Sequence, residues 1–188
     1  NNGAGYGAIA GNIKGGLGSA SIYVPELDIT VGAIAAVNSA GSVLIPGTKA
    51  FYAWDMELEN EFGGILPPEN FDKAIIAVPK HSSLHENTTL AVVATDANLT
   101  KSETRRLAII SQNGLSRAIR PSSTPLDGDI VFAISTGEKN IDDKVTKIGT
   151  LGAHAANCLG RSVARAVYEA ETLGKISSYR DLQDNDEN

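Results

Sequence analysis

The sequence predicts an α+β fold, in which antiparallel strands come first along the chain and the helices that cover them come later. Residues 21–45 hold short, partly β-branched apolar runs separated by turn residues, which is typical of strands. Residues 100–173 hold long stretches with apolar residues at helical spacing. A chain of 188 residues with 42% hydrophobic content can bury a substantial core, so we expect residues 1–188 to form a single domain.

The first part of the chain predicts a three-stranded antiparallel meander. Residues 21–24 and 29–37 form a hairpin, and a turn at 38–41 leads into a third strand at 42–45. The glycine-rich segments before residue 19 look like loops or site walls, which need unusual dihedrals or a close approach of the backbone.

The middle of the chain is irregular. Residues 48–86 contain an acidic patch and the pair Pro67-Pro68, which predicts an exposed connector where cutting of the chain is tolerated. Within it, residues 74–78 fit a strand and a helical turn equally well.

The elements after residue 87 alternate between strands and helices. A Thr-x-x-Glu capping box at 100–103 begins a helix that Pro121 ends. The last helix is thin over part of its surface because glycine and alanine gather there, so a neighbour can pack closely, which favours a homo-oligomer. The expected elements are a strand at 90–95, a helix between 100 and 121, a strand at 130–135, a helix at 145–173 and a frayed acidic tail at 181–187.

Composition excludes several classes of function. The formal net charge of -6 comes without a basic cluster, so we expect no nucleic-acid partner. Neither a membrane span nor a zinc-type Cys/His spacing occurs, and Cys158 is the single cysteine, so we expect a soluble cytoplasmic protein without a metal. A loose Gly-x-Gly-x-x-Ala match at 3–8 lacks a preceding strand, so we expect no cofactor.

Thr88 is the most informative candidate for chemistry. It follows Asn87 and opens an apolar run, and a cut between these two residues would give it a free α-amino group. Such an amine titrates near about 7.7 to 8.0 and can act as general base for the hydroxyl of the same residue. The alternative is that Thr88 simply begins a strand, where β-branched residues are common. The pattern alone favours this second interpretation.

A serine hydrolase that relies on a histidine is disfavoured, because the sequence contains no Gly-x-Ser-x-Gly elbow. His154 lies in the pattern of the last helix, where a packed or surface role is expected, and the other two histidines lie in the irregular connector. The candidate histidines for such a pair are His81, His85 and His154, and the candidate serines are Ser82, Ser83 and Ser111.

Four further residues each allow an ordinary and a functional interpretation. Lys14 is either a surface lysine or a charge close to a substrate, and Asn38 is either a turn residue or an amide donor for an oxyanion. Asp127 and Asp129, which flank Gly128, either cap a turn or orient an ammonium group. Taken one by one, the ordinary interpretation prevails for all four.

Taken together, several segments resemble the L-aminopeptidase/D-esterase family of N-terminal-nucleophile hydrolases, which includes β-aminopeptidases and the nylon-oligomer (6-aminohexanoate-oligomer) endo-hydrolase. Their order and spacing agree over most of the chain except residues 48–86 and the acidic tail. The segments are Gly3-Ala4-Gly5 with residues 14–21, then 31–38, then 87–95 with 99–101, 106–108 and 117–121, and finally 127–133.

The resemblance implies a four-layer α/β/β/α sandwich and a precursor that cuts itself into 1–87 and 88–188, two chains that stay together. It implies Thr88 as nucleophile, Asn38 as oxyanion donor, and Lys14, Asp127 and Asp129 as the polar network around the nucleophile. Many aminopeptidases of the family use serine, whereas threonine is the nucleophile of the nylon-oligomer enzyme. The implied activity is therefore hydrolysis of a small-molecule amide, whether in a peptide, an amino-acid amide or a polyamide oligomer.

The family also has a long segment upstream of the Gly-Ala-Gly motif, with a strand that carries a tyrosine near the nucleophile. Residues 1–188 contain no counterpart of this segment, so either this chain is part of a longer protein or its site is incomplete. Two other functions stay open from the sequence. One is acyl transfer to an amine, as in the N-terminal-threonine ornithine acetyltransferases, and the other is a non-enzymatic oligomeric binding module in which Thr88 only begins a strand.

Overall fold

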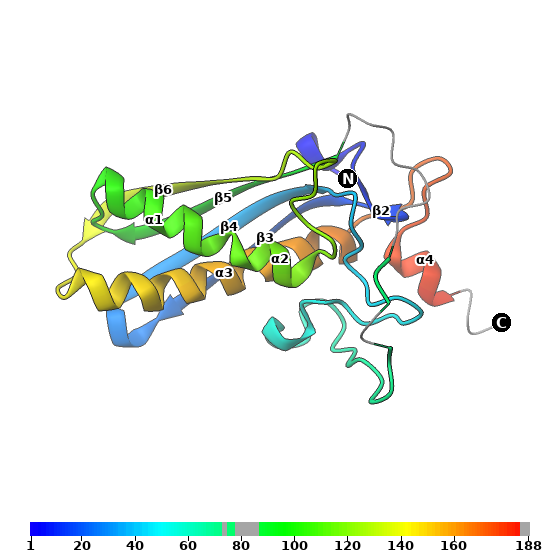
Figure 1. Ribbon diagram of the computed structural model, residues 1–188, viewed down its shortest axis with the longest axis horizontal. Coiled ribbons are helices and arrows are strands. Elements are labelled where there is room, and N and C mark those ends of the chain that lie inside the picture. Colours follow the sequence, from blue (N-terminus) through cyan, green and yellow to red (C-terminus); the bar gives the residue numbers. More distant parts are fainter. Residues whose placement is uncertain (73–74, 78–86, 185–188) are drawn as a thin grey trace.

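The computed structural model describes residues 1–72, 75–77 and 87–184 and centres on one four-stranded sheet (Figure 1). The strand order is β3-β4-β5-β6, with β3 and β4 antiparallel, β4 and β5 antiparallel, and β5 and β6 parallel. The strands span Gly16–Val24 (β3), Ile29–Asn38 (β4), Thr88–Ala97 (β5) and Ile130–Lys139 (β6).

Three helices cover one face of this sheet. α3 (Lys144–Tyr168) packs along β3 and β4, while α1 (Lys101–Ser111) packs on β6 and on α3, and α2 (Asn113–Ala118) packs on α3. Glycines in β3 allow α3 to approach closely, because a Cβ at Gly18 would lie 2.2 Å from the Ser162 carbonyl oxygen. The glycine-rich segment before residue 19 therefore serves close backbone approach, and its last part is strand and not loop.

The opposite face of the sheet is apolar and uncovered among the described residues. Each of the four strands has at least one large apolar side chain that points away from the helices and is between 38% and 54% exposed, whereas Ala36 and Val92 on this face are more buried. The exposed side chains include Leu17, Ile34, Leu90, Ile130, Phe132 and Ile134. The described residues thus form one helical layer and one sheet layer, which confirms the α+β class and supplies two layers of the predicted four-layer sandwich.

The predicted meander is wrong in its third strand. Ser42 and Leu44 form only isolated bridges, with Arg120 and Phe51, because β5 occupies the free edge of β4. The expectation of a purely antiparallel sheet is also wrong. The connection from β5 to β6 runs through α1 and α2, and a helical crossover returns the chain in the parallel direction.

The segment predicted as an exposed connector is partly core. Phe51 and Phe62 are 2% and 1% exposed, and Phe51 stacks at 4.8 Å between ring centroids on Tyr179. Aromatic rings from a polar stretch therefore extend the core beyond the sheet. Residues 75–77 form neither strand nor helix, and the other residues of the ambiguous run at 74–78 lie outside the described residues.

The helices differ from the prediction at their ends. The capping box at Thr100 and Glu103 is confirmed, but the expected single helix divides at Gln112 into α1 and α2. α3 ends at Tyr168 and not at residue 173, because the chain turns back after it and Leu173 bridges Ile176.

Part of the thin surface of α3 is used within the chain. A Cβ at Gly152 would lie 2.6 Å from Ile110 in α1, and one at Gly160 would lie 2.4 Å from the Met56 sulfur. The glycines therefore admit α1 and the segment around Met56 to the helix axis.

The remaining elements are short. The tail predicted to fray instead begins with α4 (Tyr179–Asp184), because Tyr179 is fully buried and its hydroxyl donates to the Lys49 carbonyl oxygen at 2.9 Å. A small hairpin precedes β3 and consists of β1 (Ile9–Ala10) and β2 (Ile13–Lys14). The described residues also contain three short 3-10 helices: η1 (Gly3–Gly5), η2 (Pro25–Leu27) and η3 (Trp54–Met56). Within the described ranges, no helix combines the length and apolar character that crossing a bilayer requires.

Candidate functional site

Thr88 and Asn38 lie opposite each other at one end of the sheet. Thr88 is the first residue of β5 and Asn38 the last of β4, and the two are direct partners in the antiparallel ladder. Because alternate residues of a strand point to opposite faces, Thr88 shares the uncovered face with Leu90, whereas Thr89 is fully buried on the helix side. The proposed nucleophile and oxyanion donor thus project from the same uncovered face.

The hydroxyl of Thr88 lies against the peptide bond that precedes it. Thr88 Oγ1 donates a hydrogen bond to the carbonyl oxygen of Asn87 at 2.7 Å. The same carbonyl oxygen accepts a second hydrogen bond, at 2.9 Å, from the backbone N–H of Gly128. Among the described residues, the side-chain amide nitrogen of Asn87 is buried without a hydrogen-bond partner.

The amide of Asn38 is oriented by the small hairpin. Ile9 N–H in β1 donates to Asn38 Oδ1 at 2.9 Å. An N–H donor requires the oxygen end of the amide, so this contact fixes which end of Asn38 is oxygen and turns the donating NH2 end away from Ile9. The arrangement suits a residue that presents a donor.

Asp127 and Asp129 connect the turn before β6 to the backbone next to Thr88 and Asn38. Asp129 Oδ1 accepts from Thr89 N–H at 2.8 Å, and Asp127 Oδ1 accepts from Ala40 N–H at 3.0 Å. Burial raises the pKa of the Asp129 carboxyl above its usual value, against the opposing effect of the backbone N–H groups of Thr89 and Ser123. A partly buried carboxylate with a raised pKa beside a candidate nucleophile is typical of functional sites.

Lys14 is not a surface lysine. Its side chain is 1% exposed, and Nζ donates to the carbonyl oxygens of Gly5 at 3.0 Å, Ala8 at 2.8 Å and Gly15 at 2.7 Å. Burial lowers the pKa of the Lys14 ammonium. Since an ammonium has three donors, these contacts use all of them, and they hold the segment that carries Ile9 against the end of β4.

The structure therefore brings together Thr88, Asn38, Asp127 and Asp129. Lys14 instead binds backbone carbonyls on both sides of Ile9, the residue that donates to Asn38. The alternative serine and histidine pairs receive no support among the described residues. Ser111 Oγ donates to the Leu107 carbonyl oxygen within α1, and His154 lies 3.7 Å from Glu26. His81, His85, Ser82 and Ser83 lie outside the described residues.

Sequence reasoning missed the contributions of Ile9 and Gly128. Both act through backbone N–H groups, which no side-chain pattern reveals. Gly128 had one signal, because a glycine between two acidic residues indicates a tight turn or a close contact. A Cβ at this position would lie 2.8 Å from Thr88 Oγ1, so the close contact is with the candidate nucleophile itself.

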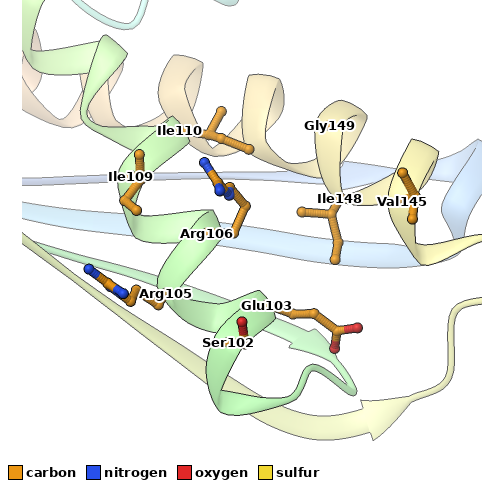
Figure 2. A pocket seen from close by; sticks show the side chains of 9 residues that line it. All are labelled: Ser102, Glu103, Arg105, Arg106, Ile109, Ile110, Val145, Ile148 and Gly149. Atoms are coloured by element: carbon orange, nitrogen blue, oxygen red, sulfur yellow. The ribbon is translucent and has the colours of Figure 1, made fainter.

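Two hollows of the described surface differ in their distance from Thr88 and Asn38. One, of about 390 Å³, lies between α1 and the first turns of α3, where Figure 2 shows the side chains of Arg106 and Ile110. It is lined by none of the five predicted site residues. A smaller one, of about 280 Å³, lies on the uncovered apolar face, where Ala36 and Leu90 each stand two residues from the site.

Solved structures place this fold in a known class. The chain covers 50% of the L-aminopeptidase D-Ala-esterase/amidase from Ochrobactrum anthropi, with a TM-score of 0.63, 20% identity and 96% of this chain aligned. A Burkholderia sp. β-aminopeptidase aligns with a TM-score of 0.60 and 22% identity over 96% of this chain and 51% of its own. The first of these is described as a variant of the Ntn hydrolase fold, so the chain has the fold of N-terminal-nucleophile hydrolases.

Sequence comparison identifies the family. Residues 1–180 match Peptidase family S58, so the chain belongs to this family. Uncharacterized aminopeptidase Rv1333 of Mycobacterium tuberculosis is 39% identical over 193 residues, which cover 96% of this chain and 55% of that protein. Uncharacterized aminopeptidase ML1167 of Mycobacterium leprae is 41% identical over 187 residues, with 94% and 51% covered. The chain spans about half the length of these curated relatives.

Proposed function

We propose that the full-length protein is a self-cleaving amidohydrolase with Thr88 as its N-terminal nucleophile. The observation that carries the proposal is the contact between the Thr88 hydroxyl and the carbonyl oxygen of Asn87 at 2.7 Å, opposite Asn38. Membership of Peptidase family S58 and the Ntn hydrolase fold support the class of reaction.

In the first stage, Thr88 Oγ attacks the carbonyl carbon of Asn87. The hydroxyl proton passes to the departing nitrogen of Thr88, and the peptide bond becomes an ester. Water then hydrolyses the ester, which leaves a carboxylate on Asn87 and both a free amine and a free hydroxyl on Thr88. The new amine has a pKa near about 7.7 to 8.0, so much of it is neutral and able to accept a proton at neutral pH.

In the second stage, the same hydroxyl attacks the amide carbonyl of a substrate. The amine of Thr88 accepts the hydroxyl proton and delivers it to the leaving amine, while the NH2 group of Asn38 donates to the oxyanion. Water releases the acyl group. Asp127 and Asp129 hold the turn beside the site through Ala40 and Thr89.

The two halves, 1–87 and 88–188, would stay together after the cut. β4 belongs to the first half and β5 to the second, and they pair over eight residue positions from Val31 and Thr95 to Asn38 and Thr88. The hydrophobic core also contains residues from both halves. Separation would expose this core to water, and this cost supports the proposal of a tight complex of the two chains.

We propose a short peptide, an amino-acid amide or a polyamide oligomer as substrate. The threonine nucleophile favours the amidase branch of the family that contains the nylon-oligomer enzyme. We further propose a cytoplasmic homo-oligomer, for which the single free and buried Cys158 supports the reducing compartment.

Intact mass of the purified full-length protein tests the proposal. The wild-type protein should give two fragments, the second of which begins at Thr88. Thr88→Ser should also split because it keeps a hydroxyl, whereas Thr88→Ala should stay intact and lack amidase activity. Two fragments from Thr88→Ala would overturn the mechanism, and product analysis with an added amine acceptor would separate hydrolysis from acyl transfer.

A further inference from the structure

Gly128 contacts both reacting groups of the proposed self-cleavage, the carbonyl oxygen of Asn87 and the hydroxyl of Thr88. Its N–H donates to the Asn87 carbonyl oxygen at 2.9 Å, and its Cα approaches Thr88 Oγ1 so closely that a Cβ would lie 2.8 Å from that oxygen. On the side of residue 128, both contacts are made by the glycine backbone.

We propose that the backbone N–H of Gly128 is the oxyanion donor for self-cleavage, an inference that rests on the proposed function. When Thr88 Oγ bonds to the carbonyl carbon of Asn87, the carbonyl oxygen gains negative charge. The N–H of Gly128 already donates to this oxygen at 2.9 Å in the uncut chain, so it is placed to strengthen its hydrogen bond as the charge develops. The bond to the Thr88 nitrogen then breaks, the nitrogen takes the hydroxyl proton, and the charge returns to a carbonyl.

The donor is held in place by the residues that flank it. Asp127 is anchored to Ala40 N–H, which follows β4 by two residues, and Asp129 is anchored to Thr89 N–H in β5. The turn is thus fastened to both strands that carry the site, and the N–H of Gly128 needs no reorientation when the charge develops.

The absence of a side chain at residue 128 has its own role. A Cβ at this position would lie 2.8 Å from the Thr88 hydroxyl oxygen and would crowd it. Glycine therefore leaves the room in which the intact precursor holds its nucleophile against the scissile bond.

Self-cleavage and substrate hydrolysis thus use different oxyanion donors. Gly128 serves the carbonyl of Asn87, which leaves the site once the chain is cut, whereas Asn38 is assigned to the carbonyl of the substrate. Loss of the Gly128 contact should therefore slow maturation, which is measurable as the appearance of fragments without any substrate.

The test follows the rate at which the full-length protein splits, by intact mass at set times after synthesis. Gly128→Ala keeps the N–H but places a methyl group 2.8 Å from the position of Thr88 Oγ1, so it should displace the hydroxyl and slow the appearance of the fragments. Gly32→Ala is the matched control, because the same methyl group in β4 meets no atom closer than 3.7 Å, and it should split at the wild-type rate. Far-UV circular dichroism and a thermal melt verify that both variants fold.

A second variant isolates the hydrogen bond from the steric effect. Replacement of Gly128 with glycolic acid exchanges the N–H for an ester oxygen and adds no atom, so it should slow splitting by on the order of 100-fold even where the alanine variant misfolds. Wild-type rates in the glycolate variant would overturn the inference while leaving the proposed function intact. A wild-type protein that never splits between Asn87 and Thr88 would overturn the proposed function itself.

Discussion

Replacement of Lys14 by methionine should destabilise the protein strongly, and the size of the effect follows from three hydrogen bonds. The ammonium donates to the carbonyl oxygens of Gly5, Ala8 and Gly15 at 2.7 to 3.0 Å in a site that is almost closed to water. Methionine matches the length of lysine but makes none of the three hydrogen bonds, although the Ala8 oxygen keeps the Gly15 N–H and the Gly5 oxygen keeps the Ala8 N–H. Each lost hydrogen bond to the charged donor costs about 1.5 to 3 kcal/mol, and the relief from burying an ammonium offsets part of the sum.

We therefore expect Lys14→Met to lower the free energy of unfolding by about 3 to 5 kcal/mol, a large part of the roughly 5 to 15 kcal/mol that holds a typical domain together. The assay is urea unfolding at pH 7, followed by circular dichroism, in the full-length protein with Thr88→Ala in the background. That background keeps the chain uncut, so both proteins compared are single chains. Lys101→Met is the control, because Lys101 is exposed at the start of α1 and should change stability by less than about 0.5 kcal/mol.

The same variant separates two roles for Lys14. A positioning role through Ile9 and Asn38 predicts that stability and turnover fall together, as measured with the cleavable protein. A loss of turnover at unchanged unfolding free energy would refute this reasoning, because it would show that the ammonium acts on the chemistry and not on the backbone that it binds.

Two further predictions concern single side chains. Asn38→Asp keeps the oxygen that accepts from Ile9 N–H but removes the NH2 donor, so turnover of an amide substrate by the cleaved protein should fall by roughly 100-fold or more, and unchanged turnover would remove Asn38 from the mechanism. Burial raises the pKa of the Cys158 thiol to about 11, so at pH 8 only about one thiol in a thousand is ionised. A thiol reagent at pH 8 should therefore label Cys158 rapidly only after the protein is unfolded in guanidinium, and equal labelling rates before and after unfolding would contradict its burial.

The local elements were predictable because local chemistry determines them. The hairpin of β3 and β4, the strand β5 and the capping box at Thr100 all follow from alternation, β-branching and a side chain that caps a helix. Their boundaries moved by a few residues, since strand ends depend on partners that the pattern does not contain.

The errors concern partners that are distant in sequence. No local signal shows that β5 and not residues 42–45 pairs with β4, or that Phe51 and Tyr179 meet in the core although their segments are polar. The thin surface of α3 is a further case. Its small residues indicated a close neighbour, and only the structure shows that α1 and the segment around Met56, both of the same chain, pack on part of it.

For the site, the sequence identified the residue types, and the strand register supplies their geometry. Resemblance to the family singled out Thr88 and Asn38, and the register places them opposite each other. Lys14 was expected beside the nucleophile, but its hydrogen bonds run to backbone carbonyls of the segment behind Asn38. Contacts made by a backbone N–H, as at Gly128, leave almost no trace in a sequence.

The uncovered face of the sheet connects the fold to the chemistry. Thr88 and Asn38 share this face with Ile34, Leu90 and Phe132, which are 42% to 54% exposed, whereas the opposite face is closed by helices. In the four-layer sandwich that the Ntn hydrolase fold implies, a second sheet packs on such a face, and its side chains would border the same end of β4 and β5. Electrostatic stabilisation of an oxyanion is strongest where water is excluded, so the layer that covers the apolar residues would also strengthen the donors at Asn38 and Gly128.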